Sequence, residues 1–216
     1  MTCRIILCRH GNTFGEGDRV VMVGANEDLP LTSRGLEQAA DIGESLRVCA
    51  ASVSRFIAGP LKRTVEFAKV VQDVANICIP FEVDGRLVEL DYGEWGGLSN
   101  DQIAALSGEE ALYNWQCHGK RPEGIVFQPA EDTLAKETQS VLDECSQLQG
   151  VAVVITSNGR LREYARIVDQ VGGSGAKVKT GHACILEYSD GRWQSMAWNI
   201  TAEQLRSYLL LHKTSA

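Results

Sequence analysis

Short apolar runs that alternate with helical patterns constrain the fold more than any other feature of this sequence. The runs lie at 3–8, 53–58 and 151–157, and the helical patterns at 32–48, from Pro60 to 75, and at 159–171. Each run is too short for a buried helix, and each helical segment places small or apolar residues on one face. Strands that alternate with helices predict a three-layer α/β/α sandwich with a mainly parallel sheet.

The second half of the chain departs from this rhythm in two places. Residues 181–188 and 192–198 read as two strands joined by Asp190-Gly191, a strong hairpin pattern, before a final helix that opens with a capping box at 201–204. Residues 98–130 show no strand pattern, and we interpret them as a small lid-like insertion over the carboxyl edge of the sheet, where open α/β folds bind ligands. We therefore expect one domain over residues 1–216.

Charge and cysteine usage narrow the classes of function. The formal net charge is -7, so the chain gains nothing from the counterion release that drives nucleic-acid binding. No apolar stretch approaches the length of a signal-peptide core or a membrane-spanning helix, so we expect no membrane partner. Seven cysteines without a CxxC pair indicate reduced thiols in a cytoplasmic protein rather than a disulfide framework or a metal site.

The first apolar run ends in Arg9-His10-Gly11-Asn12-Thr13. A histidine at the carboxyl end of a buried strand is displayed where a ligand can reach it, and neutral imidazole is a competent nucleophile towards phosphorus. The guanidinium of Arg9 can take two phosphate oxygens at once. Gly11 would let the backbone approach a ligand closely.

Two further segments carry groups that suit phosphate chemistry. Arg63 follows the second run in Gly59-Pro60-Leu61-Lys62-Arg63, where a helix N-terminus would favour an anion. Glu89 lies among apolar residues and glycines in the segment 87–97. A carboxyl group there could supply the proton that a leaving alkoxide needs.

These segments together resemble the histidine phosphatase (phosphoglycerate mutase-like) superfamily. Its pattern runs from a strand into RHG, through segments like DxPLTxxGxxQA and SPLxRAxxTA, to one like LxExxxGxWEG, and the chain matches at 7–13, 28–39, 59–68 and 87–97. The resemblance implies that His10 becomes phosphohistidine, that Arg9 and Arg63 clamp the phosphoryl oxygens, and that Glu89 protonates the leaving group. Asn12 and Thr13 would add hydrogen bonds to the phosphate. It also implies no metal and no cofactor.

The chain departs from this family at one position. The strand at 151–157 should end in a second histidine, and Asn158 stands there instead. Asparagine offers a neutral hydrogen bond but carries no charge. Three explanations remain open: an introduced substitution, a natural one compensated elsewhere, or a protein that binds phosphate esters and turns them over slowly. His182, near the start of the next strand, is our candidate for an exchange of roles with Asn158 as a phosphate ligand.

The sequence therefore predicts a phosphomonoesterase that acts on a small phosphorylated metabolite through a phosphohistidine. A phosphoglycerate mutase-like phosphoryl transfer and a catalytically weak phosphate-ester-binding protein are the alternatives. Segments 15–23 and 115–127 are the candidates for substrate specificity, and neither contains a pattern that identifies the substrate.

Overall fold

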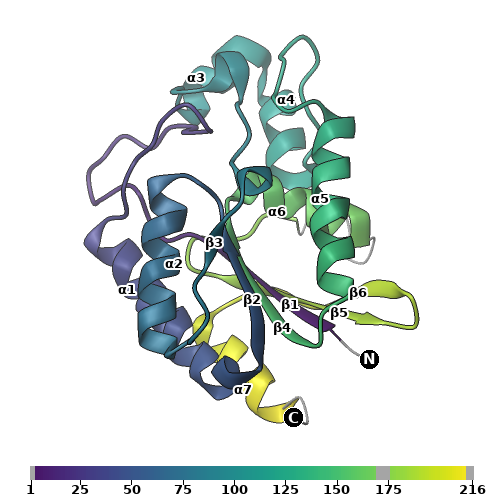
Figure 1. Cartoon of the computed structure of the whole chain (residues 1–216). Helices are drawn as coiled ribbons and strands as arrows, with labels where there is room; N and C mark the ends of the chain where they lie inside the picture. The colour runs from purple at the N-terminus through teal and green to yellow at the C-terminus, as the bar shows by residue number, and fades with distance from the viewer. Residues whose placement is uncertain (1–2, 169–175, 213–216) are drawn as a thin grey trace.

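The apolar runs form strands of one six-stranded sheet in the computed structural model, which describes residues 3–168 and 176–212 (Figure 1). The strands are β1 (Cys3–Arg9), β2 (Val53–Ala58), β3 (Glu82–Val83), β4 (Gly150–Thr156), β5 (Ala183–Ser189) and β6 (Arg192–Ile200). Their order is β3-β2-β4-β1-β5-β6. The pairs among β1 to β4 are parallel, whereas β5 pairs antiparallel with both β1 and β6. The expected mainly parallel sheet is confirmed.

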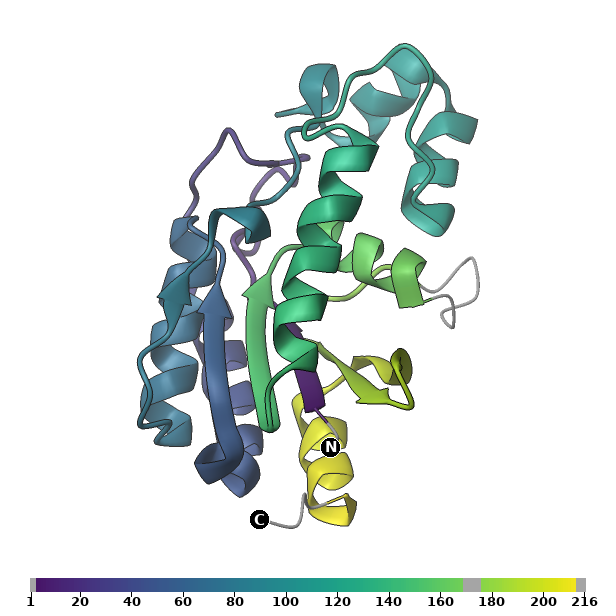
Figure 2. The same ribbon diagram turned by 45° about the vertical axis from the view of Figure 1, so that its right-hand side comes forward.

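Helices cover both faces of the sheet, as Figures 1 and 2 show. The α-helices are α1 (Ser33–Leu46), α2 (Lys62–Ala75), α3 (Asn100–Ser107), α4 (Glu109–Tyr113), α5 (Glu131–Ser146), α6 (Asn158–Val168) and α7 (Ala202–Leu211). The chain also forms short helical turns. The 3-10 helices are η1 (Arg47–Ser52), η2 (Gly85–Leu87) and η3 (Gly93–Trp95), and the π-helix is η4 (Asn114–His118).

The alternation of side chains along β1 divides the core into two layers. Ile6 and Cys8 pack in a cluster with α1, α2 and α7, whereas Ile5 and Leu7 pack in a second cluster with α5 and α6. Successive residues of a strand point to opposite faces of a sheet, so a strand buried on both faces is apolar throughout. The two clusters hold the carboxyl ends of the parallel strands in fixed positions.

The segment 98–130 forms helices α3, α4 and η4 at the end of the molecule above these strand ends (Figure 2). It contributes to a third apolar cluster that includes Trp95, Trp115 and Phe127, whose rings meet edge to face. A capping box formed by Ser99 and Gln102 is present at the start of α3. This arrangement agrees with the position expected for a lid.

The predicted boundaries of the strands and helices are close to those observed. The second helix begins at Lys62 rather than at Pro60, and the backbone amide of Lys62 donates to Asp28 Oδ1 at 2.6 Å. The helix predicted over 159–171 begins at Asn158, and residues 169–171 lie outside the described part of the chain. The Asp190-Gly191 hairpin is confirmed, with both residues at positive φ, and so is the capping box of α7.

All seven cysteines are free, in agreement with the prediction of reduced thiols. Burial raises the pKa of the Cys3 and Cys8 thiols to about 12. A weaker contribution comes from Cys145 for Cys3 and from Cys49 for Cys8. Both thiols therefore stay protonated near neutral pH.

Across residues 3–168 and 176–212, no helix is both long and apolar enough to cross a membrane.

Candidate active site

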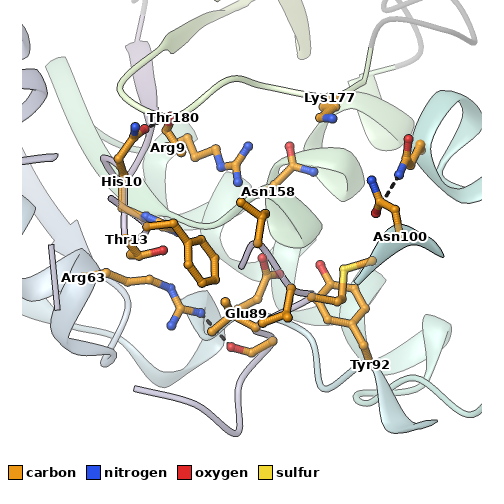
Figure 3. Close-up of a pocket in the computed structure, with 18 of the residues that line it drawn as sticks. Arg9, His10, Thr13, Arg63, Glu89, Tyr92, Asn100, Asn158, Lys177 and Thr180 are labelled. Carbon is orange, nitrogen blue, oxygen red and sulfur yellow. Dashed lines mark hydrogen bonds between the residues drawn. The ribbon is translucent and has the colours of Figure 1, made fainter. Parts of the chain in front are cut away.

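The residues expected to carry chemistry meet where β1, β2 and β4 end. The backbone amide of His10 donates to Thr156 O at 3.1 Å, and that of Gly59 donates to Ile155 O at 3.0 Å, so the three strand ends lie side by side. They border a cavity of about 420 Å³, which Figure 3 shows with its side chains. The lining includes Arg9, His10, Asn12, Thr13, Arg63, Glu89, Tyr92, Trp115, Asn158, Arg162, Lys177 and Thr180.

His10 is buried and held in one tautomer. Its Nδ1 lies 2.8 Å from the carbonyl oxygen of Gly11, which can only accept, so Nδ1 carries the proton and Nε2 keeps its lone pair. Burial, followed by the charges of Arg9 and Arg63, lowers the pKa of His10 well below 6.5. A neutral imidazole with a free Nε2 is the form that attacks phosphorus.

We expect His10 to protonate only well below pH 6.5 in the folded protein, whereas in the unfolded chain it has the ordinary pKa of 6.5. Between these two pKa values the unfolded state binds more protons than the folded state. The free energy of unfolding therefore decreases as the pH falls through 6.5. A nitrogen-15 titration of the labelled imidazole should show the neutral ring persisting as the pH falls below 6.5. A His10 midpoint near 6.5 would contradict this expectation.

The two arginines that flank His10 are anchored through backbone carbonyls. Arg63 is almost fully buried, and its two terminal nitrogens donate to Glu27 O at 2.9 Å and Gly24 O at 2.7 Å. Arg9 donates through Nη1 to Val178 O at 2.6 Å. Each terminal guanidinium nitrogen carries a second N–H group, so these contacts fix the side chains without using all of their donors.

Asn12 and Thr13 also line the cavity. Asn12 Oδ1 accepts from the hydroxyl of Thr180, and the Asn12 backbone amide donates to Gln38 Oε1 at 2.8 Å.

Gly11 has a role that the sequence did not reveal. A Cβ at Gly11 would overlap the backbone of Gly35, so this glycine permits close packing of the loop on α1.

Glu89 is buried beside the first turn of α6. Its Oε1 accepts from the backbone amides of Leu90 at 2.8 Å and Gly159 at 3.0 Å. The segment before it is fixed as well, because Arg160 Nε donates to Val88 O at 2.6 Å. The carboxyl group therefore keeps one orientation, with Gly159 providing the space for it.

Asn158 is the first residue of α6 and lines the cavity, as expected. Its Oδ1 accepts from the Val178 amide at 2.9 Å, which leaves the NH₂ group as its donor. His182 is not among the residues that line the cavity. Its Nδ1 lies 3.0 Å from Asn199 O of β6. The geometry thus gives no support to an exchange between His182 and Asn158.

Sequence reasoning missed two cations of the cavity, Arg162 and Lys177. Arg162 lies one helical turn after Asn158, so the spacing within the sequence could have placed both on one helix face. Lys177 follows the undescribed residues 169–175, and no pattern in the sequence indicated its position.

In the described part of the chain, no group of three His, Cys, Asp or Glu residues is placed to hold a metal ion.

Comparison with known proteins gives a consistent result. The sequence model of the histidine phosphatase superfamily (branch 1) matches residues 5–201. A "Probable phosphoglycerate mutase GpmB" of Salmonella choleraesuis is 28% identical over 207 residues, covering 90% of this chain and 89% of the relative. The mycobacterial glucosyl-3-phosphoglycerate phosphatase superposes with a TM-score of 0.74 at 21% identity, over 93% of this chain and 100% of that one. The structure of Bacillus stearothermophilus YhfR superposes with a TM-score of 0.72 at 22% identity, over 93% of this chain and 98% of that one.

Proposed function

Because this chain belongs to the histidine phosphatase superfamily, we propose that it hydrolyses phosphate monoesters with His10 as the nucleophile and Glu89 as the proton donor. The observation that carries the proposal is the state of His10. Its Nδ1 is bound to Gly11 O, which leaves the lone pair on Nε2, and it lines, together with Arg9 and Arg63, a cavity large enough for a small ester.

The proposed reaction has two steps. Nε2 of His10 forms a bond to phosphorus as the ester P–O bond breaks, and Glu89 in its protonated form gives its proton to the departing alkoxide. Glu89 then takes a proton from water, which attacks the phosphohistidine to release inorganic phosphate and free His10. Arg9 and Arg63 stabilise the charge on the phosphoryl oxygens in both steps.

A mutase is the second candidate, and the name of the Salmonella relative favours it. A mutase returns the phosphoryl group to a second hydroxyl instead of to water, and it needs a bisphosphate to phosphorylate its histidine. The two functions therefore differ in their dependence on a bisphosphate primer.

The test is phosphate release from a panel of small phosphomonoesters in the presence of a metal chelator. We expect turnover without a primer, and an acid-labile, base-stable phosphoryl group on His10 after rapid quenching with labelled ester. Isomerisation that requires a bisphosphate would establish the mutase instead. Binding of esters without phosphate release or labelling of His10 would instead support a protein that binds phosphate esters and turns them over slowly, the explanation that Asn158 left open.

A further inference from the structure

Arg160 is a buried cation in the first turn of α6, and it is not among the described residues that line the cavity. Its Nε donates to Val88 O at 2.6 Å, and its Nη1 donates to Glu137 Oε2 of α5 at 2.6 Å. Removal of a guanidinium from water is costly, and a buried ion pair often adds little net stability. The geometry of this pair, rather than its stabilising energy, therefore calls for an explanation.

Val88 and Glu89 lie in a stretch that belongs to no helix or strand, so individual hydrogen bonds set the course of the backbone. The hydroxyl of Thr156 donates to Leu87 O at 2.8 Å, and Arg160 binds the next carbonyl along the chain. The carbonyl of Val88 and the amide nitrogen of Glu89 belong to one planar peptide unit. Fixing Val88 O therefore fixes the backbone from which the Glu89 side chain departs.

Consecutive residues of α6 thus hold both parts of Glu89. The Gly159 amide donates to the carboxyl group at 3.0 Å, and Arg160 holds the peptide unit before it. Glu137 in turn fixes the guanidinium from α5, the helix that packs against α6 (Figure 2). A catalytic group that is misplaced by about 1 Å can lose about 10² in rate, so this support matters to a proton donor.

We propose that Arg160, oriented by Glu137, is a positioning residue that keeps Glu89 in place to protonate the leaving group. Arg160 acts through the carbonyl of Val88 and lies outside the cavity lining, away from the reacting atoms. The inference rests on the proposed function, in which Glu89 is the proton donor. Loss of Arg160 is then expected to slow the step that needs this proton.

The test uses two phosphate monoesters that differ in their need for a proton. An alkyl phosphate releases a strongly basic alkoxide, whereas 4-nitrophenyl phosphate releases a weakly basic phenolate that departs without a proton. The kcat/KM of each ester reports the reaction up to formation of the phosphohistidine. The readout is the ratio of the alkyl to the 4-nitrophenyl value. A smaller folded fraction or weaker phosphate binding lowers both values and cancels, so a purely structural role of Arg160 would not change the ratio.

Arg160→Met has a similar length but no hydrogen-bond donor, and we expect it to lower the ratio by at least about tenfold. Arg160→Lys keeps a charged donor and should restore part of the ratio. Glu137→Gln keeps an oxygen acceptor and should lower the ratio less than Arg160→Met does. Arg55→Met is the matched control, because the hydrogen bonds of Arg55 run to Glu144 and Cys145 of α5 rather than to the backbone beside the proton donor. Its ratio should equal that of the unmodified protein.

Glu89→Gln separates the inference from the proposed function. If Glu89→Gln lowers the ratio and Arg160→Met does not, Arg160 has no positioning role and the inference is wrong. If Glu89→Gln leaves the ratio unchanged, the proposed proton donor is wrong, and the role of Arg160 in positioning it falls as well.

A crystal structure of Arg160→Met gives a second readout that needs no turnover. We expect Glu89 Oε1 to leave the Gly159 amide. A carboxyl group that keeps this bond and its position would overturn the inference, even if the protein released no phosphate. If Arg160→Met does not fold, the double variant with Glu137→Met takes its place, because it removes both charges of the pair together.

Discussion

Replacing His10 by asparagine is expected to lower kcat for phosphomonoesters by at least about 10³-fold, because His10 is the proposed acceptor of the phosphoryl group. The substitution retains polarity in a buried position and leaves Arg9 and Arg63 in place, so the variant should still bind inorganic phosphate. The measurement is phosphate release under saturating ester, together with the acid-labile label after rapid quenching.

The matched control is the same substitution at His182, whose ring faces Asn199 O outside the cavity. His182→Asn should keep kcat within about threefold, as for most substitutions away from a site. Turnover that survives in His10→Asn would refute a nucleophilic role for His10. Loss of turnover in His182→Asn, with the fold intact, would restore the exchange between His182 and Asn158.

Gly159→Ala is expected to reduce kcat by about 10²-fold or more, which is the usual contribution of a positioned general acid. A Cβ at this position would overlap Oε1 of Glu89 and would lie 2.8 Å from Cγ of Leu90. The carboxyl group would have to leave the Gly159 amide and lose its orientation. The measurement is kcat and KM together, since displacement of a proton donor affects kcat more than binding.

A matched substitution separates this effect from a general cost of alanine. Gly85 has open space around the position of a Cβ, so Gly85→Ala should leave kcat unchanged. A double-mutant cycle then identifies the mechanism. If Gly159→Ala acts through Glu89, adding it to Glu89→Gln should cost little further activity, whereas full additivity would assign the loss to another cause.

The fold was largely predictable because its strands and helices are encoded locally. Residues 5–8 are apolar on both faces, as a strand inside a covered sheet requires, and Thr32 caps α1 through the Gly35 amide. The start of α2 was misplaced because Asp28, distant in sequence, caps Lys62. A contact between two loops leaves no periodic pattern in either of them.

The candidate site was predictable where each group lies next to a recognisable strand end, as for His10 and Asn158. Arg63 was placed by the helix that follows its strand. Arg162 was missed although it lies one helical turn after Asn158, and its contacts with Gln116 and Trp115 of the insertion have no pattern in the sequence. His182, just before β5, does not line the cavity, and its ring lies against Asn199 O of β6, a contact that sequence spacing does not specify.

The anchoring of Arg63 bears on how such a site can diversify during evolution. Its terminal nitrogens hold backbone carbonyl oxygens rather than side chains, namely those of Glu27 and of Gly24, which has a positive φ. Residues 20–23, immediately before this anchor, line the cavity with their side chains. Mutations there can alter which alcohol is accepted without loosening Arg63, the arginine that we propose as a ligand of the phosphoryl group. Substrate preference can therefore change by mutation while the position of Arg63 stays the same.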